Sequence, residues 1–305
     1  MAEKMIKKIL KKSYLLIGLI VFILIIKDVN FEHLKNRVSE INFFWFGLAA
    51  LVLIFDHIIR AIRWKIIVAS QTIYHSLKDS LFMYGASSLL GAITPGKLGD
   101  FSRIVYLKKE GHSLGKSFTG NFLEKIFDLF FGVPFVLIGA AVLPFVPHLS
   151  NNYVPAFKWG SLIVLISVFL VIFVYKKTDK GRKFLLDILK ELKKIGPKEL
   201  FLVSSITIFE WLLYFLTIYF ISISIGLTNQ VNFFYIAFSG TFVLFASFLP
   251  ISILNIGTRE TTLLFLLAPF AVAKETIILF SLLIMLNSLI VMPLFLFCWI
   301  KKPLI

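Results

Sequence analysis

The chain has 305 residues, of which 58% are hydrophobic and 16% charged, with a formal net charge of +15. A soluble domain carries about 25% charged residues, so this composition excludes an ordinary soluble protein. The Lys and Arg residues adjoin long apolar stretches, which excludes a nucleic-acid-binding face and is typical of loops beside membrane spans. We therefore expect an all-α polytopic membrane protein whose partners are membrane lipids.

Six apolar stretches are predicted to span the membrane. They are Ser13–Ile26, Ile41–Ala61, Phe118–Val146, Ala156–Tyr175, Leu200–Ile225 and Thr276–Ile300. The first stretch follows a lysine-rich N-terminus and superficially resembles a signal peptide. Lys27 and Asp28 follow it, however, and no small-residue cleavage site does, so we predict an uncleaved first helix.

Two further apolar segments are interrupted by Pro or Gly and by charged residues. Ser80–Leu107 is interrupted at Thr94–Arg103, and Phe233–Ala273 is interrupted at Pro250–Glu260. Non-helical backbone at membrane depth is tolerated only when it is buried in protein or lines a wet cavity. Since the arms are short for spans, we predict two re-entrant broken-helix hairpins.

Loop charges predict the orientation. Segment 176–198 carries many more Lys and Arg residues than acids, which favours the cytoplasm, and its apolar spacing predicts an amphipathic surface helix. A multi-pass cell-membrane protein with both termini cytoplasmic fits every loop. Residues 41–146 and 200–300 then form an inverted repeat within one membrane domain, 1–305, as in many secondary transporters. Two unrelated kinks in ordinary spans are the alternative.

Charged side chains within apolar segments are costly, so they and the neighbouring turn residues are the candidate site residues. The first break supplies Pro95, Gly96, Lys97, Gly99, Asp100 and Arg103. If a helix restarts near Gly99, its amides and Lys97 are suited to bind an anion. Alternatively, Asp100 and Arg103 share a helical face and form a pair that only holds the hairpin together.

The second break supplies Gly257, Arg259 and Glu260. Glu260 occupies the same place in its repeat as Asp100 in the first, just after the Gly turn. An acid at a helix start also stabilises that helix by capping and by the helix dipole, which is the simpler interpretation. Asn255 follows Pro250 by five residues and tolerates unusual backbone angles.

Further charged residues lie in the predicted spans. Arg63 shares a face of the second span with Asp56 and Arg60, and either binds substrate or extends to lipid phosphate. Glu124 and Asp128 are four residues apart and repel each other, so one is protonated or paired, with a hairpin arginine as a candidate partner.

The fifth span contains an acid, Glu210, without a basic partner nearby in the sequence. An intramembrane acid of this kind is a candidate for proton relay, as are Glu124 and Asp128; a neutral, hydrogen-bonded Glu is the alternative. No Walker loop, nucleophile elbow or metal-ligand spacing occurs in the sequence. We expect no catalytic residues, no cofactor and no metal, and hence no enzyme.

The motifs resemble those of a known family. Arg60-Ala61-Ile62-Arg63-Trp64, the run Thr94–Asp100 followed by Arg103, and Gly257-Thr258-Arg259-Glu260 are similar to its arginine-tryptophan signature, central motif and second-half motif. This family is the lysylphosphatidylglycerol synthase transmembrane region, also called flippase-like. Two departures are Asp100, where the family usually has Glu, and the absence of Gly soon after Pro250.

The resemblance implies transfer of a polar-headed lipid between leaflets. Synthase activity is not expected, because only Lys301–Ile305 follow the last predicted span. The substrate is expected to be an anionic or phosphate-bearing phospholipid, or a phosphate-linked isoprenoid glycolipid. A homo-oligomer and a separate lipid-synthesising enzyme are the expected protein partners. The alternatives are an ion-coupled secondary transporter of a small solute and a non-catalytic membrane scaffold that uses 176–198.

Overall fold

The computed structural model describes residues 17–142, 193–248 and 252–304, together with positions 177–179, 182, 186 and 190. These residues form helices and connecting turns, without a strand among them. Several predictions fall outside the described residues: the fourth span Ala156–Tyr175, about half of the linker 176–198, and Pro250. The polytopic, all-helical class is confirmed, whereas the inverted repeat and the re-entrant paths stay predictions.

Three of the described helices are long and apolar enough to cross a membrane: α4 (Phe43–Ser70), α10 (Pro197–Ser224) and α13 (Lys274–Lys301), each of 28 residues. Helix α4 continues well beyond its predicted end at Ala61. The sequence pattern stops there because charged residues follow, but Arg63 and Trp64 are completely buried in protein, so they do not end the helix. A charged residue therefore marks the edge of an apolar pattern without marking the end of the helix.

The remaining helices are shorter or less apolar. Helix α7 (Leu114–Val142) begins before the predicted start of the third span and contains Pro134. Helix α2 (Ile17–Lys27) is apolar but has only 11 residues. The others are α3 (Phe31–Ser39), α5 (Leu77–Ile93), α6 (Arg103–Lys109), α11 (Phe233–Ala246) and α12 (Thr258–Leu267), with short 3-10 helices η2 (Pro95–Ser102), η4 (Leu227–Asn229) and η5 (Ala268–Phe270).

The chain divides into two compact units, each assembled from separate stretches. Unit 1 consists of Met1–His57, Phe82–Ser102 and Leu212–Ile305, and unit 2 consists of Ile58–Leu81 and Arg103–Trp211. Both breaks, up to Ser102 in the first, therefore belong to unit 1. The arginine that follows the first break begins the second stretch of unit 2.

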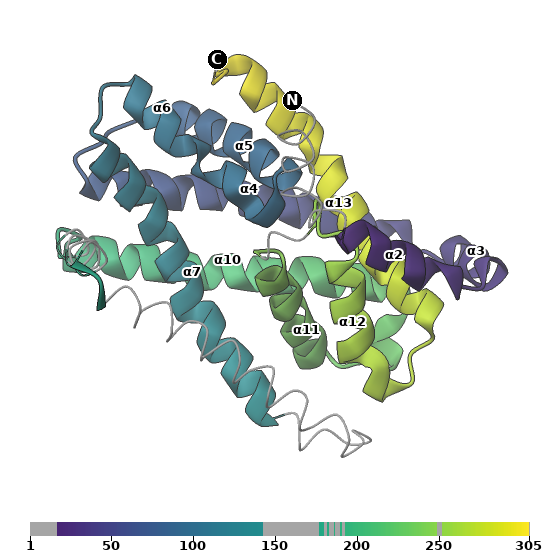
Figure 1. Cartoon of the computed structure of the whole chain (residues 1–305). Coiled ribbons are helices and arrows are strands. Elements are labelled where there is room, and N and C mark those ends of the chain that lie inside the picture. The colour runs from purple at the N-terminus through teal and green to yellow at the C-terminus, as the bar shows by residue number, and fades with distance from the viewer. Residues whose placement is uncertain are drawn as a thin grey trace, which may run out of the picture. The chain divides into compact units, whose positions relative to one another are not determined.

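In unit 1, the short helix α12 is at the centre of the packing. It contacts α11, α13 and α2, and α13 also contacts α3 (Figure 1). Tyrosine hydroxyls join neighbouring elements, since Tyr235 donates to the carbonyl of Leu266 at 2.8 Å and Tyr214 donates to that of Gly240 at 2.6 Å. These bonds satisfy polar groups that lipid would leave without partners.

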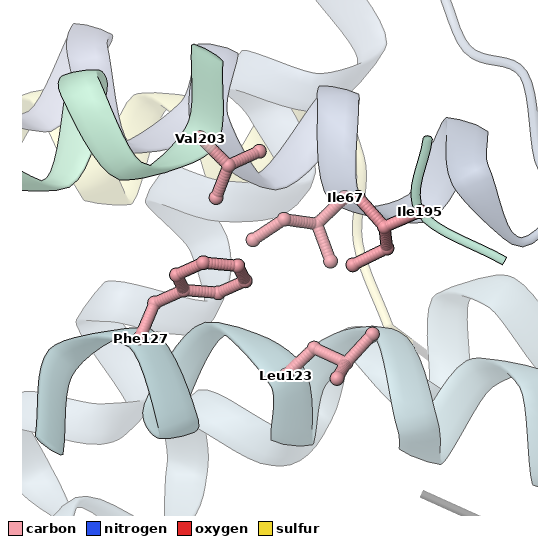
Figure 2. Packing of buried hydrophobic residues seen from close by; sticks show 5 residues of the cluster. All are labelled: Ile67, Leu123, Phe127, Ile195 and Val203. Atoms are coloured by element: carbon pink, nitrogen blue, oxygen red, sulfur yellow. The ribbon is translucent and has the colours of Figure 1, made fainter. Parts of the chain in front are cut away.

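In unit 2, α6 packs against α7, and an apolar cluster joins α4, α7 and the start of α10. Figure 2 shows the five converging side chains, which are Ile67, Leu123, Phe127, Ile195 and Val203. All five are at most 7% exposed. This cluster fixes the rotation of the three helices about their axes, and so decides which of their polar residues face one another.

Candidate functional site

A buried arginine is the centre of the charged cluster in unit 2. Arg63 of α4 is 0% exposed. Its Nη1 lies 2.8 Å from Oδ1 of Asp128 and 2.9 Å from Oε2 of Glu210, and its Nη2 lies 3.4 Å from Oε1 of Glu124. Nη1 also donates to the hydroxyl of Thr207 at 3.0 Å. One guanidinium thus holds three acids from two other helices.

A second arginine extends this cluster. Arg103, the first residue of α6, is 2% exposed, and its Nη1 lies 2.5 Å from Oε2 of Glu124. The two oxygens of Glu124 therefore bind different arginines. The guanidinium of Arg103 also lies over the ring of Trp64, 5.5 Å from its centroid, which is within the range of a cation–π interaction. The expected pairing of an acid of the third span with a hairpin arginine is confirmed.

The cluster contains three acids and more than two cations. Besides Arg63 and Arg103, Arg60 on the same helix lies close enough to Arg63 to interact with its charge. Buried ion pairs lose solvation that their attraction only partly returns. Asp128, at 19% exposure of its side chain, is the least buried of the three acids. Since Glu124 contacts two arginines, it keeps one partner if the other moves.

The first break is a tight turn in unit 1. Gly96 and Lys97 are consecutive residues in the left-handed region, with φ of 61° and 54°. Thr94 joins the two ends of the turn, since its hydroxyl accepts from the amide of Gly99 at 2.7 Å and donates to the carbonyl of Leu90 at 2.7 Å. A Cβ at position 99 would overlap this Leu90 carbonyl, so the close approach requires glycine.

Helical backbone resumes near Gly99, but as a 3-10 helix. The segment Pro95–Ser102 is interrupted by the non-helical Gly96 and Lys97, and the α-helix begins at Arg103. The amide of Gly99 already donates to Thr94, because the chain turns back onto α5 before it continues. Asp100 lies against α5 as well, since a Cβ on Gly91 would overlap its Oδ1.

The second break repeats the unusual backbone of the first. Leu254 and Asn255 are consecutive residues at φ of 54° and 59°, which confirms the expectation for Asn255. Gly257 follows at φ of 85°, and a Cβ there would overlap the carbonyl oxygen of Gly18 on α2. Position 257 thus requires glycine both for its backbone angle and for the close approach of another helix.

The charged residues of the second break form a capped pair. Glu260 accepts through Oε2 from the amide of Gly257 at 2.6 Å, which is the glutamate half of a capping box at the start of α12. Its other oxygen, Oε1, lies 3.1 Å from Nη2 of Arg259 and accepts from the hydroxyl of Ser281. The Nε of Arg259 donates to the same hydroxyl at 2.7 Å. Capping, the simpler interpretation of Glu260, is what the geometry shows.

The lysine of the first break lies close to the segment that precedes the second break, within unit 1. The Nζ of Lys97 lies 5.8 Å from the ring centroid of Phe248, which follows α11. Sequence reasoning missed the hydroxyl partners Thr207 and Ser281. Hydroxyls are frequent in apolar helices, where they usually bond to their own backbone, so nothing in their spacing distinguishes these two.

Comparisons with known proteins identify the family. Residues 13–295 match the lysylphosphatidylglycerol synthase transmembrane region. A UPF0104 membrane protein of Methanocaldococcus jannaschii is 28% identical over 193 residues, which cover 58% of this chain and 78% of that protein. No solved structure matches the chain. Since this match covers nearly the whole chain, the chain belongs to the lysylphosphatidylglycerol synthase transmembrane region family of multi-pass membrane proteins.

Proposed function

We propose that this protein is a lipid translocase that moves a phospholipid or a phosphate-linked isoprenoid glycolipid between leaflets. Family membership supports a membrane lipid as the substrate. The observation that carries the proposal is Glu124, bound at one oxygen by Arg63 and at the other by Arg103. A phosphate is the natural competitor for a guanidinium that binds a carboxylate, because both anions accept the same pair of hydrogen bonds.

In the proposed mechanism, Arg103 exchanges its partner. When a lipid phosphate binds the guanidinium of Arg103 in place of Glu124, Glu124 keeps its contact with Arg63. Its charge is therefore not left unpaired in a medium of low dielectric. Trp64 holds the Arg103 side chain on the other side, at 5.5 Å from its guanidinium carbon, and limits how far the arginine moves.

In unit 1, the two breaks provide the turns of the proposed inverted repeat. Each contains two consecutive left-handed residues, Gly96–Lys97 and Leu254–Asn255, and this likeness supports their equivalence. The approach of Lys97 to Phe248 supports hairpins that lie close together. The amides of Gly99 and Gly257 donate to protein side chains, so Lys97 and Arg259 are the groups that we assign to phosphate in this unit.

The membrane orientation is part of this proposal. Both termini are assigned to the cytoplasm on the loop charges, and alternating access moves one repeat against the other. A homo-oligomer and a separate enzyme that synthesises the lipid are the proposed protein partners. Segment 176–198 is proposed as a basic helix on the cytoplasmic surface that attracts anionic lipid.

Reconstitution into liposomes with a fluorescent anionic phospholipid tests this function. Loss of a hydrogen bond between charged groups is worth about 1.5–3 kcal/mol, so Arg103→Gln is expected to slow translocation roughly 10- to 100-fold. Arg37→Gln is the matched control, because Arg37 forms an exposed pair with Glu40 on α3. Wild-type translocation in Arg103→Gln liposomes, with correct folding and insertion, would overturn the proposed role of Arg103.

An ion-coupled carrier of a small solute is the second candidate, and the three acids gathered around Arg63 favour it. This carrier would take up protons with its solute, whereas a translocase would not require a pH gradient across the liposome. The discriminating measurement follows the pH inside liposomes while fluorescent lipid moves. Proton uptake that depends on Glu210 but not on added lipid would favour the carrier.

A further inference from the structure

Two histidines and a glutamate from two separate turns of unit 2 gather at one point. His75 lies in the connection between α4 and α5, and Glu110 and His112 lie between α6 and α7. One nitrogen or oxygen from each lies within 4.8 Å of the other two. We propose that His75, Glu110 and His112 bind a divalent transition-metal ion, with Zn²⁺ as the best match for this donor set.

The backbone of both turns is fixed by hydrogen bonds. After α4, the amide of Ile73 donates to the carbonyl of Val68 at 3.1 Å, and the side chain of Ile73 is completely buried. After α6, the amide of His112 donates to the carbonyl of Leu107 at 3.1 Å. A third bond joins the start of α7 to the turn after α4, since Lys116 Nζ donates to the hydroxyl of Thr72 at 3.0 Å. The three proposed ligands therefore lie on two turns whose backbones are fixed and adjacent.

The chemistry of the three groups indicates the class of metal. Two imidazoles and one carboxylate suit Zn²⁺ and its neighbours in the transition series, whereas Mg²⁺ and Ca²⁺ prefer oxygen donors. Tetrahedral Zn²⁺ with three protein ligands keeps its fourth position for water. The Nδ1 of His75 already lies 3.3 Å from Oε2 of Glu110, close to the separation of two ligands on one zinc ion. Glu110 is partly exposed, so its side chain is able to adjust.

The proposed site adjoins the charged cluster through one aromatic ring. The rings of His75 and Trp64 are stacked, with centroids 6.1 Å apart and an angle of 7° between their planes. Trp64 also contacts Arg103, and its indole nitrogen donates to Asn121 at 3.1 Å. A metal ion that fixes the His75 ring would therefore also restrict Trp64, which provides an optical signal for binding.

The test uses the full chain, purified in detergent with an affinity tag that contains no histidine. Titration with Co²⁺, followed by its visible absorption, and competition with Zn²⁺ report affinity and stoichiometry. We expect one ion per chain, and an affinity at least about tenfold weaker in His75→Gln and in His112→Gln. His33→Gln is the matched control, since His33 is an exposed histidine of α3 in the other unit.

A gain in affinity makes the test independent of variants that fail to fold. Glu110→His supplies a third imidazole and is expected to bind Zn²⁺ more tightly than the wild type. Cu²⁺ should quench tryptophan fluorescence in the wild type and much less in Trp64→Phe. Absence of Co²⁺ absorption in the wild type, or equal Zn²⁺ affinity in the wild type and the folded His75→Gln/His112→Gln variant, would overturn the proposal.

Discussion

The two charged clusters use arginine in different ways. Around Arg63, two arginines and three acids come from helices far apart in the sequence, and Glu124 is shared between both guanidinium groups. Around Arg259, one arginine and one acid are adjacent in the sequence, and the acid also caps its own helix. The first arrangement makes the positions of several helices depend on a single side chain, whereas the second mainly shapes one local turn.

The largest expected loss in the free energy of unfolding comes from removing Arg63, the arginine that the acids share. Arg63→Met leaves three buried acids without their common partner, and losing one member of a buried pair costs about 3–5 kcal/mol. Unfolding of the detergent-solubilised protein measures this change. The added substitution Glu210→Gln should recover part of the loss, because it removes one buried charge. No recovery in the double variant would contradict the role of Arg63 as the partner of Glu210.

A smaller loss in the free energy of unfolding is expected at Arg259 and Glu260, whose opposite charges balance. Glu260→Gln keeps an acceptor for the amide of Gly257 but removes the charge that faces Arg259. Losing charge-assisted hydrogen bonds of this kind costs roughly 1.5–3 kcal/mol, and the same unfolding measurement applies. If Glu260→Gln destabilises the protein more than Arg63→Met does, the distinction between a shared and a local cluster is wrong.

The turn of the first break provides a comparison without charge. Gly99→Ala places a Cβ against the carbonyl of Leu90, and overpacking of this kind typically costs about 1–3 kcal/mol. Gly47→Ala, in α4, is the control, because a Cβ there meets nothing within 4 Å. That control should gain about 0.5–1 kcal/mol from the better helix propensity. Equal stability of the two variants would show that the turn relaxes freely.

The smallest effect is expected at an ion pair on the surface. Arg37 and Glu40 lie 3.1 Å apart on α3, with side chains 46% and 63% exposed. Exposed pairs contribute at most about 1 kcal/mol, so Arg37→Ala should change the unfolding free energy little, and less still at high salt. A larger loss would mean that exposure is a poor guide to the strength of the ion pairs in this chain.

Sequence patterns predicted the helical membrane class and the approximate positions of α4, α10 and α13, since long apolar runs leave few alternatives. They also identified Glu124 and Asp128 as acids that require compensation. Partners distant in the sequence are harder to predict, because the rotation of each helix is set by packing such as that of Ile67 on Leu123. Arg63 and Glu210 are 147 positions apart, and no local spacing connects them.

The histidine cluster is a second example of partners that are too far apart in the sequence to be predicted from local patterns. His75 lies 35 positions before Glu110, so no short motif of metal ligands is visible. The turns bring these residues together only after α4, α5 and α6 have formed. The Gly turns were easier to identify, because glycine and proline mark breaks in any apolar run. Even there, the sequence did not reveal that the Thr94 hydroxyl would accept a hydrogen bond from the amide of Gly99.

The contact between Gly18 and Gly257 joins positions at opposite ends of the chain. The carbonyl of Gly18 occupies the space that a side chain at position 257 would need. Helix α2 therefore packs directly against the second break and supports its backbone. Shortening the protein at its N-terminus through α2 would therefore expose the Gly257 turn and the capped pair behind it. Fusion partners and purification tags are better placed at the C-terminal end of α13 than beside the contact between Gly18 and Gly257.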